Sequence, residues 1–302
     1  MENIVKRSVT IGLMQMSCTD DKRANLEKAV RLIKDAAGQG AQIVCTQELF
    51  QTQYFCQALN PRNFDLAEKL DEDTPLIKNF SELAKELEIV LISGLFEKRA
   101  PGLFHNTAVV IDADGTFLGK YRKMHIPHDP GYLEKFYFTP GDLGYKVFKT
   151  RYADLGVLIC WDQWFPEAAR LTAMKGAEVI LIPTAIGFSP RAKNSQEALD
   201  SCKTWQIVQQ GHAVANACFI AAVNRVGFEE TPGSPDGIQF WGKSFIATPS
   251  GGLLAEASFE QEETLICEID LSEVERTRNR ESFPFRDRRV DSYQEITRLY
   301  SD

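Results

Sequence analysis

The sequence predicts an α/β protein in which helices cover mixed β-sheets. Short runs of β-branched and other apolar residues alternate along the chain with longer segments that carry apolar residues at helical spacing. Two further segments have the pattern of antiparallel hairpins, so we expect sheets with both parallel and antiparallel strands. The 302 residues contain no linker rich in glycine, serine or proline and no internal repeat. We therefore expect a single domain over residues 1–302.

In the first half of the chain, strands and helices alternate before a hairpin. The expected strands are Val9–Met14, Gln42–Thr46 and Ile89–Leu95, and the expected helices are Asp21–Gly38 and Thr74–Leu87. The dipeptide Asp114–Gly115 lies between Thr107–Asp112 and Thr116–Arg122. Because Asp-Gly favours the tight turn that joins antiparallel strands, these two segments are predicted to pair as a hairpin.

The second half of the chain continues the alternation and ends with another hairpin pattern. The expected strands are Leu155–Ile159, Val179–Pro183 and Phe219–Asn224, and the expected helices are Pro166–Lys175 and Ser195–Ala217. Ser244–Ala247 and Thr264–Ile269 are predicted to pair around a turn at Ser250–Gly252. The arginine-rich segment Glu275–Arg289 is expected to begin a C-terminal extension that is solvated or contacts another subunit.

Charge and cysteine content exclude several classes of protein. A formal net charge of −8 argues against a nucleic-acid partner, because phosphate binding needs a concentrated basic surface. The seven cysteines include no CxxC pair, which argues against a disulfide scaffold or a zinc ribbon. The chain has no secretory leader pattern and no apolar run of about 18 residues. We therefore expect a reduced, cytoplasmic protein that does not bind membranes.

One cysteine stands at a position suited to catalysis. In DLGVLICWDQWFPE, the apolar run Leu155–Ile159 ends at Cys160, and Pro166 then opens a helix. A nucleophile on a sharp strand-to-helix turn lies above the sheet, near backbone N–H groups that can bind an oxyanion. The alternative is that Cys160 is an inert buried side chain, which is the common fate of a cysteine.

A glutamate and a lysine also follow predicted strands. Glu48, in TQELF, comes directly after Gln42–Thr46, and Lys123, in GKYRKMHIP, follows the second strand of the first hairpin. In α/β proteins the carboxyl ends of strands surround the ligand crevice. There Glu48 would serve as a general base, and Lys123 would stabilise a thiolate or an oxyanion. The alternative is that both are ordinary solvent-facing side chains.

The histidines do not indicate a metal site. His125, His128 and Asp129 lie close together in HIPHDP, but the spacing is not that of a helical zinc pair, and Pro127 interrupts any helix there. We expect His125 and His128 to form hydrogen bonds in the wall of the site, with no bound metal. His212 is expected to be a buried, hydrogen-bonded side chain rather than a base. No nucleotide-binding glycine loop is present.

In this order along the chain, the glutamate, lysine and cysteine motifs resemble those of the nitrilase-like carbon–nitrogen hydrolase family. The resemblance extends over nearly the whole chain, through GLMQM, TQELF, GLFHNTAVVIDADG, KYRKMHIP, FYFTPGD, ICWDQWFPE, VNRVG and FWGKSFIATPSG. It implies a four-layer α-β-β-α sandwich with two mixed sheets and an amidohydrolase that needs no cofactor. It also implies a homo-oligomer, either a dimer or an assembly of dimers.

The resemblance also implies roles for individual residues. Glu48, Lys123 and Cys160 correspond to the family's catalytic triad, and Glu134, from GYLEKFYFTPG, to a second glutamate near the substrate nitrogen. In the implied mechanism Glu48 deprotonates Cys160, and the thiolate attacks an amide-like carbonyl carbon. Lys123 and the backbone N–H of Trp161 hold the oxyanion. Ammonia or an amine leaves, and water activated by Glu48 then cleaves the thioester.

Within this family, the segment after Cys160 is most similar to that of the N-carbamoylputrescine amidases. Relatives that hydrolyse N-carbamoyl amino acids commonly carry an arginine shortly after the cysteine, whereas this chain has Gln163 and Trp164. Because an arginine fork is an efficient partner for a carboxylate, we expect a substrate with a distal ammonium group. The alternatives are a β-ureidopropionase-like carbamoylase, an ω-amidase, a true nitrilase, or a non-catalytic binding module that retains the fold.

Aromatic side chains are candidates for a slot that holds the aliphatic part of the substrate. They are Tyr54, Trp161, Trp164 and Phe188. Such rings can pack on methylene groups and attract an ammonium through cation–π contacts, although at least one of them is expected to be a core or subunit contact. Glu197 and Asp200, near the start of the predicted helix Ser195–Ala217, are candidate partners for the distal ammonium.

Overall fold

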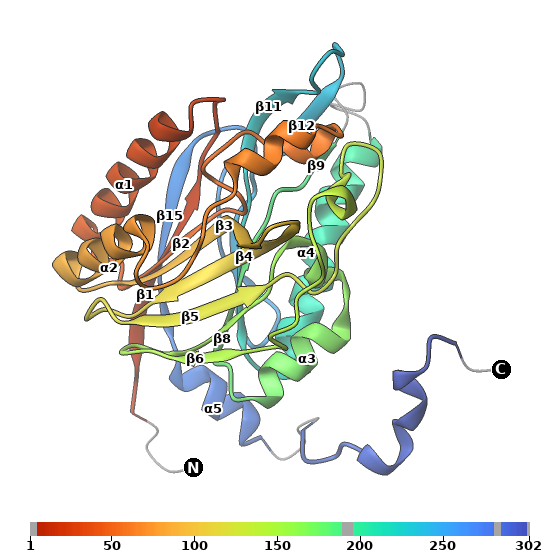
Figure 1. The fold of residues 1–302 in the computed structure, drawn as a ribbon. Helices are drawn as coiled ribbons and strands as arrows, with labels where there is room; N and C mark the ends of the chain where they lie inside the picture. The colour runs from red at the N-terminus through yellow and green to blue at the C-terminus, as the bar shows by residue number, and fades with distance from the viewer. Residues whose placement is uncertain (1–4, 189–195, 281–284, 301–302) are drawn as a thin grey trace.

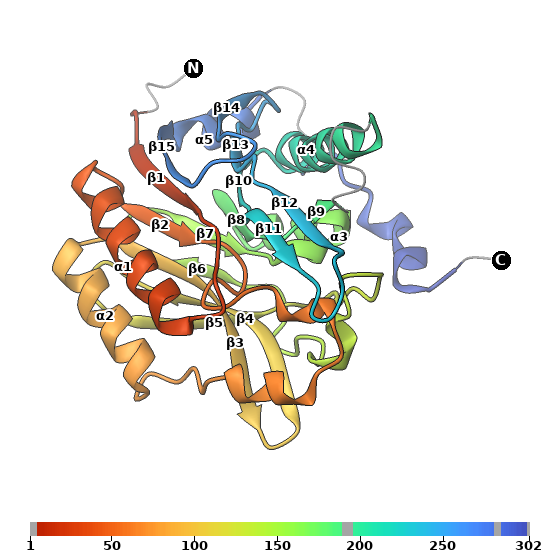
Figure 2. The same cartoon turned by 90° about the horizontal axis from the view of Figure 1, so that it is seen from above.

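Two six-stranded sheets lie face to face in the centre of the protein, and helices cover their outer faces (Figure 1 and Figure 2). The computed structural model describes residues 5–188, 196–280 and 285–300. The layers follow the order helix, sheet, sheet, helix, which is the four-layer α-β-β-α sandwich with two mixed sheets expected from the sequence. Over the described ranges, no helix is both long enough and apolar enough to cross a lipid bilayer.

The first sheet has the strand order β15-β1-β2-β3-β4-β5. Its strands are β1 (Ser8–Gln15), β2 (Ile43–Thr46), β3 (Val90–Ala100), β4 (Leu103–Ile111), β5 (Phe117–Arg122) and β15 (Glu263–Asp270). β1, β2 and β3 run parallel, whereas β4, β5 and β15 form antiparallel pairs. Helices α1 (Lys22–Gly38) and α2 (Pro75–Leu87) cover the outer face of this sheet.

The second sheet has the strand order β14-β13-β10-β8-β7-β6. Its strands are β6 (Val147–Lys149), β7 (Asp154–Val157), β8 (Val179–Pro183), β10 (Phe219–Val223), β13 (Phe245–Ala247) and β14 (Leu253–Glu256). Helices α3 (Pro166–Met174) and α4 (Gln196–Asn216) lie on its outer side. A smaller sheet joins β11 (Val226–Glu230), β12 (Gly237–Trp241) and β9 (Gly187–Phe188).

Short 3₁₀ helices occur in the connecting segments. They are η1 (Phe55–Gln57), η2 (Pro61–Leu66), η3 (Glu134–Phe136), η4 (Cys160–Trp164), η6 (Val290–Ser292) and η7 (Gln294–Thr297). Two of them, η3 and η4, carry residues that the sequence marks as candidates for catalysis.

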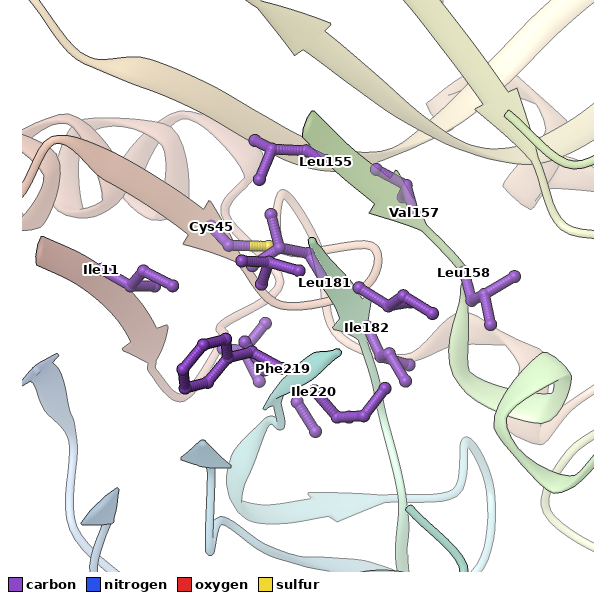
Figure 3. Packing of buried hydrophobic residues seen from close by; sticks show 14 of the residues in the cluster. Ile11, Cys45, Leu155, Val157, Leu158, Leu181, Ile182, Phe219 and Ile220 are labelled. Carbon is purple, nitrogen blue, oxygen red and sulfur yellow. The ribbon is translucent and has the colours of Figure 1, made fainter. Parts of the chain in front are cut away.

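Apolar side chains fill the space between the two sheets (Figure 3). Ile11 and Cys45 of the first sheet and Leu155, Leu181 and Phe219 of the second belong to this cluster, and all five are fully buried. Alternate side chains of the first sheet point the other way and pack against α1 and α2. Burial of this apolar surface on both sides of the first sheet is the main contribution that stabilises the layered arrangement.

The second predicted hairpin is wrong. β13 pairs with β14, whereas β15, which contains the predicted strand Thr264–Ile269, lies in the first sheet and pairs with β1 along its whole length. Pairing with β15 satisfies the backbone groups on the side of β1 that faces away from β2. β14 has no alternating apolar pattern, so the sequence does not predict this strand. Its Leu253 and Leu254 are exposed.

The segment predicted to begin the C-terminal extension starts within a helix. Glu275–Arg278 belong to helix α5 (Ser272–Arg278), and Val274 on this helix is buried. Residues 281–284 of the predicted extension lie outside the described residues. In Figure 1 residues 285–300 lead away from the two sheets.

Candidate active site

The three residues of the predicted catalytic triad follow strands of both sheets. Glu48 follows β2 and Lys123 follows β5 in the first sheet, and Cys160 follows β7 in the facing sheet. A direct ion pair joins Glu48 to Lys123, and the charges of both act on the Cys160 thiol. The site therefore lies where the carboxyl ends of these strands meet.

The position of Glu48 depends on a close approach between β3 and the segment after β2. A Cβ atom on Gly94 would lie 2.8 Å from the Gln47 carbonyl oxygen and 3.0 Å from the Glu48 Cα. Contacts this short do not occur for real Cβ atoms, so the approach requires a glycine at position 94. The Gly94 N–H also donates to the Thr46 hydroxyl at 3.0 Å, which fixes the end of β2 against β3.

The Glu48 carboxylate is held through only one of its two oxygens. Oε1 accepts hydrogen bonds from Lys123 Nζ at 2.8 Å and from Asn106 Nδ2 at 2.6 Å. Within the described residues, Oε2 is buried and has no hydrogen-bond partner. One oxygen thus holds the carboxylate in place, and the other is free to accept a proton. The sequence did not indicate Asn106, although this residue lies within GLFHNTAVVIDADG.

Glu134 holds the same lysine from another direction. Its two carboxylate oxygens lie 2.9 and 2.7 Å from Lys123 Nζ, and the Tyr54 hydroxyl donates to Oε1 at 2.6 Å. The side chains of Glu48, Lys123 and Glu134 are all completely buried. Two carboxylates and one ammonium are therefore paired beneath the surface of the protein.

Cys160 occupies a strained turn between β7 and α3. Its φ angle of +44° lies in the left-handed region that non-glycine residues rarely adopt. The short helix η4 begins at Cys160, and α3 begins at Pro166. The Cys160 thiol lies 3.9 Å from the carbonyl oxygen of Ala185. This is the strand-turn-helix geometry that can present a nucleophile above a sheet.

Burial and neighbouring charges shift the pKa values of these groups. Burial raises the pKa of the Cys160 thiol well above its usual value, and Glu48 adds to this effect while Lys123 opposes it. Burial also raises the pKa of the Glu134 carboxyl. Burial would lower the pKa of Lys123, but Glu134 and Glu48 outweigh it and raise that pKa well above the usual value. The lysine is therefore charged and the thiol protonated near neutral pH.

A buried arginine supports the backbone around Glu48. Arg225 donates to the carbonyl oxygens of Glu48 at 3.1 Å, Leu49 at 2.8 Å and Thr52 at 2.8 Å, and pairs with Glu229 at 2.6 Å. Leu49 has a φ of +50°, so Arg225 holds a backbone turn that few residues adopt. Sequence reasoning missed this residue, although VNRVG contains it.

A cleft of about 740 Å³ opens onto Cys160. Its lining includes Cys160, Tyr132, Trp161, Trp164, Trp241, Asp129 and Asp200. No lysine or arginine is among the described residues that line it. The cleft therefore combines a buried thiol and aromatic walls with two carboxylates, Asp129 and Asp200, which are both exposed.

The residues predicted to bind substrate divide into two groups. Trp161 and Trp164 line the cleft. Tyr54 is instead buried and supports Glu134, and Phe188 stacks on Trp241 with ring centres 6.1 Å apart. Glu197 lies in the first turn of α4, but its side chain lies outside the described residues.

His125, His212 and Gln163 have structural partners near the site. His125 Nδ1 lies 2.7 Å from the carboxylate of Asp162, and His212 Nε2 lies 2.8 Å from the Gln163 carbonyl oxygen. The side-chain oxygen of Gln163 accepts from Trp205 Nε1 at 2.8 Å, and the Gln163 side chain is fully buried. Gln163 therefore joins the nucleophile turn to α4 and does not face the cleft. His128 is exposed.

Comparison with known proteins identifies relatives over nearly the whole chain. An N-carbamoylputrescine amidase from Oryza sativa subsp. japonica is 48% identical, over 96% of this chain and 95% of that protein. A citrullinase from Francisella tularensis subsp. tularensis is 43% identical, over 97% of this chain and 99% of that protein.

A solved structure shares both fold and sequence with this protein. The crystal structure of a carbon-nitrogen hydrolase from Helicobacter pylori G27 superposes with a TM-score of 0.91 at 44% identity, covering 98% of this chain and 100% of that one. Residues 10–279 match the family described as carbon-nitrogen hydrolase. The predicted resemblance is thus confirmed: the chain belongs to the carbon–nitrogen hydrolase family and is an amidohydrolase that acts on amide C–N bonds.

Proposed function

We propose that this enzyme hydrolyses N-carbamoylputrescine to putrescine, carbon dioxide and ammonia through a Cys160 thioester, as a step of polyamine biosynthesis. The observation that carries the proposal is the cleft, which combines Cys160 and aromatic walls with two carboxylates and has no described lysine or arginine in its lining. Such a cleft suits a carbamoyl group joined by an aliphatic chain to an ammonium. The 48% identity to the Oryza N-carbamoylputrescine amidase supports the same substrate.

Glu48 acts as the general base for Cys160. Because burial raises the pKa of the Cys160 thiol, the group needs a base at the moment when it attacks the carbamoyl carbon. Glu48 Oε1 is occupied by Lys123 and Asn106, whereas Oε2 has no partner within the described residues. Oε2 is the oxygen that takes the thiol proton.

Lys123 stabilises the oxyanion that forms on attack. Its ammonium is fixed by Glu48 and Glu134 and remains charged because both carboxylates raise its pKa. A charge that is already in place requires no reorganisation in the transition state. The backbone N–H of Trp161, directly after the nucleophile in the turn, is the second donor of this oxyanion hole.

Glu134 contributes on the side of the substrate nitrogen. It anchors Lys123 through both carboxylate oxygens, and Tyr54 fixes it in turn. In this position it accepts a hydrogen bond from an N–H of the carbamoyl group, which orients the group for attack.

Collapse of the tetrahedral adduct completes the first half of the reaction. Glu48 returns the proton to the departing nitrogen, so that ammonia or putrescine leaves and a thioester forms on Cys160. Glu48 then removes a proton from water, which attacks the thioester and regenerates the thiol. The carbamic acid released in this way splits into carbon dioxide and the remaining amine, so either order of departure gives the same products.

Citrulline is the substrate that tests specificity most closely. Its α-ammonium stands the same number of bonds from the carbamoyl carbon as the ammonium of N-carbamoylputrescine, and it differs by one added carboxylate. Near Asp129 and Asp200 that carboxylate meets like charge, and no described cation in the cleft offsets it. N-carbamoylputrescine is therefore the better substrate despite the 43% identity to a citrullinase.

Ammonia release with four substrates tests the proposed function. N-carbamoylputrescine, citrulline, N-carbamoyl-β-alanine and an ω-amide of a dicarboxylic acid are compared by kcat/KM at one pH and one salt concentration. The highest value is expected for N-carbamoylputrescine. A higher value for N-carbamoyl-β-alanine or the ω-amide would replace the proposed substrate with that of a β-ureidopropionase-like carbamoylase or an ω-amidase.

We also propose that this single-domain enzyme forms a homo-oligomer through its C-terminal extension. Val290, Ile296 and Leu299 on the extension are 65%, 64% and 105% exposed, and apolar side chains this exposed favour contact with another surface. Light scattering of the full chain should give a mass of at least two subunits. Ile296→Ser combined with Leu299→Ser should lower that mass.

A cytoplasmic location, expected from the sequence, is tested by cell fractionation.

A further inference from the structure

The carboxylate of Asp162 contacts both the segment that carries Lys123 and the turn that carries Cys160. Its side chain is fully buried and accepts four hydrogen bonds. Oδ2 accepts from the Tyr121 hydroxyl at 2.7 Å and from the Ile159 N–H at 3.1 Å. Oδ1 accepts from the His125 N–H at 2.9 Å and lies 2.7 Å from His125 Nδ1. A carboxylate oxygen accepts hydrogen bonds, so the last contact pairs Oδ1 with the tautomer of His125 that carries its hydrogen on Nδ1.

Two of the residues that contact Asp162 lie on either side of Lys123 in the sequence. Tyr121 precedes Lys123 by two residues within β5, and His125 follows it by two residues. Both the side chain and the backbone N–H of His125 are engaged. The segment that carries the lysine is therefore attached to Asp162 before and after the lysine itself.

The same carboxylate also holds the turn that carries Cys160. It accepts from the N–H of Ile159, directly before the nucleophile, while the Asp162 N–H donates to the Ile159 carbonyl at 3.1 Å. These two bonds close a ring around Cys160, whose φ is +44°. Asp162 thus stabilises the left-handed turn on which the position of the thiol depends.

Aromatic stacking adds a second link between these segments. The His125 ring lies 3.7 Å from the ring of Phe165 at an angle of 7°. Phe165 directly follows η4, the short helix that begins at Cys160. His125 is therefore attached to the nucleophile turn at both Asp162 and Phe165.

We propose that Asp162 is the positioning residue that sets the separation between the Cys160 thiol and the Lys123 ammonium. The proposal rests on the function given above to these two groups. Lys123 follows a strand of the first sheet and Cys160 a strand of the second, and the contacts between the sheets are mainly apolar. Apolar contacts are not directional, whereas four hydrogen bonds to one carboxylate fix both segments in distance and angle.

A double-mutant cycle between Asp162 and Lys123 tests this role. Asp162→Asn keeps the size of the side chain but replaces one acceptor oxygen with an N–H₂ group, and should lower kcat about 100-fold with KM changed less than about 3-fold. Lys123→Gln should lower kcat about 100- to 1,000-fold. The double variant should be no more than about 3-fold slower than the slower single variant, because a displaced lysine has little left to contribute.

Asp270→Asn is the matched control. Asp270 also accepts four hydrogen bonds, from Arg7, Ser272 and Arg276, but it lies at the end of β15 that pairs with the start of β1, where no candidate catalytic residue lies. The kcat of Asp270→Asn should equal that of the wild type. The double variant with Lys123→Gln should therefore have the same kcat as Lys123→Gln alone.

Several outcomes would overturn the proposal. A normal kcat in Asp162→Asn would exclude the positioning role of Asp162 and leave the proposed function intact. The same conclusion would follow if the loss of kcat in the double variant equalled the product of the losses in the two single variants. Normal kcat in Lys123→Gln would refute the proposed mechanism and this role with it. If Asp162→Asn does not fold, Tyr121→Phe takes its place in the cycle, with an expected loss of about 10-fold in kcat and the same lack of multiplication with Lys123→Gln.

Discussion

The buried charges of the candidate active site and the exposed charges of the cleft differ in how firmly they are held. Beside the thiol, Glu48, Lys123 and Glu134 are completely buried, and direct ion pairs connect them. At the exposed end, Asp200 accepts a hydrogen bond from the neighbouring Gln196 at 2.8 Å, and both Asp200 and Asp129 face solvent. A buried, paired charge has a fixed position, whereas an exposed carboxylate remains mobile and screened by salt.

This difference indicates that the buried residues govern the chemical step, whereas the exposed carboxylates govern which substrate binds. Changes among the buried residues should lower kcat, because the proposed mechanism has these groups act in the transition state. Changes at the exposed carboxylates should raise KM for a cationic substrate and leave kcat nearly unchanged. The following predictions test this division.

The largest effect is expected from Cys160→Ala. Removal of the proposed nucleophile should lower kcat by about 10⁶-fold while the melting temperature changes little, because the loss of one sulfur atom leaves a small cavity. Cys218→Ala is the matched control, since Cys218 is also fully buried but is not among the residues that line the cleft. Normal turnover in Cys160→Ala would exclude the thioester mechanism.

Glu48→Gln should have the next largest effect. The amide keeps the shape of the side chain but cannot accept the thiol proton at the oxygen that now has no partner, so kcat should fall by about 10²- to 10⁴-fold. Gln53→Glu is the control, because it changes an exposed side chain and should leave kcat unchanged. Gln15→Glu is not suitable, because it adds a buried charge. A Glu48→Gln variant with wild-type kcat would show that another group is the base.

The pH dependence of alkylation tests the raised pKa of Cys160. Because burial raises the pKa of this thiol well above its usual value, its thiolate fraction is small at pH 7 and grows as the pH rises. In the Glu48→Gln variant, where the proposed base is absent, the rate of iodoacetamide labelling at Cys160 should therefore still increase above pH 9. Peptide mass spectrometry follows the label, and a rate that levels off below pH 8 would contradict the predicted shift.

Asp200→Asn should affect binding more than chemistry. Loss of the carboxylate should raise KM for N-carbamoylputrescine about 10-fold, which corresponds to about 1.4 kcal/mol, with kcat changed less than about 2-fold. N-pentylurea has the same length but no ammonium, and its KM should not change. Asp20→Asn, at an exposed aspartate before α1, is the control. Equal effects on both substrates would place the ammonium elsewhere.

The smallest effect is expected from salt. Raising the ionic strength from about 0.01 to 0.15 M shortens the screening length from about 30 to 8 Å, so KM for N-carbamoylputrescine should rise about 2- to 3-fold. For N-pentylurea it should stay constant. A salt effect of the same size on both substrates would show that the exposed carboxylates do not attract the ammonium.

Local sequence predicts the strands and the reactive groups well, but not the contacts that hold them. β2 and β7 are recognisable because most of their residues are apolar, and the reactive side chains that follow them stand out. Asn106 contacts Glu48 across 58 positions and Arg225 contacts it across 177 positions. Spacing along the chain cannot reveal pairs this distant, because they depend on how two sheets meet. For the same reason Tyr54 was expected in the cleft, whereas it is buried beside Glu134.

Detection of the covalent intermediate tests the central claim most directly. The wild-type enzyme is mixed with N-carbamoylputrescine, quenched in acid during turnover, digested and examined by mass spectrometry. We predict that an acyl group from the substrate is bound to the peptide containing Cys160 and absent from the peptides with the other six cysteines. Turnover with an adduct on a different residue, or adduct formation in Cys160→Ala, would contradict the mechanism.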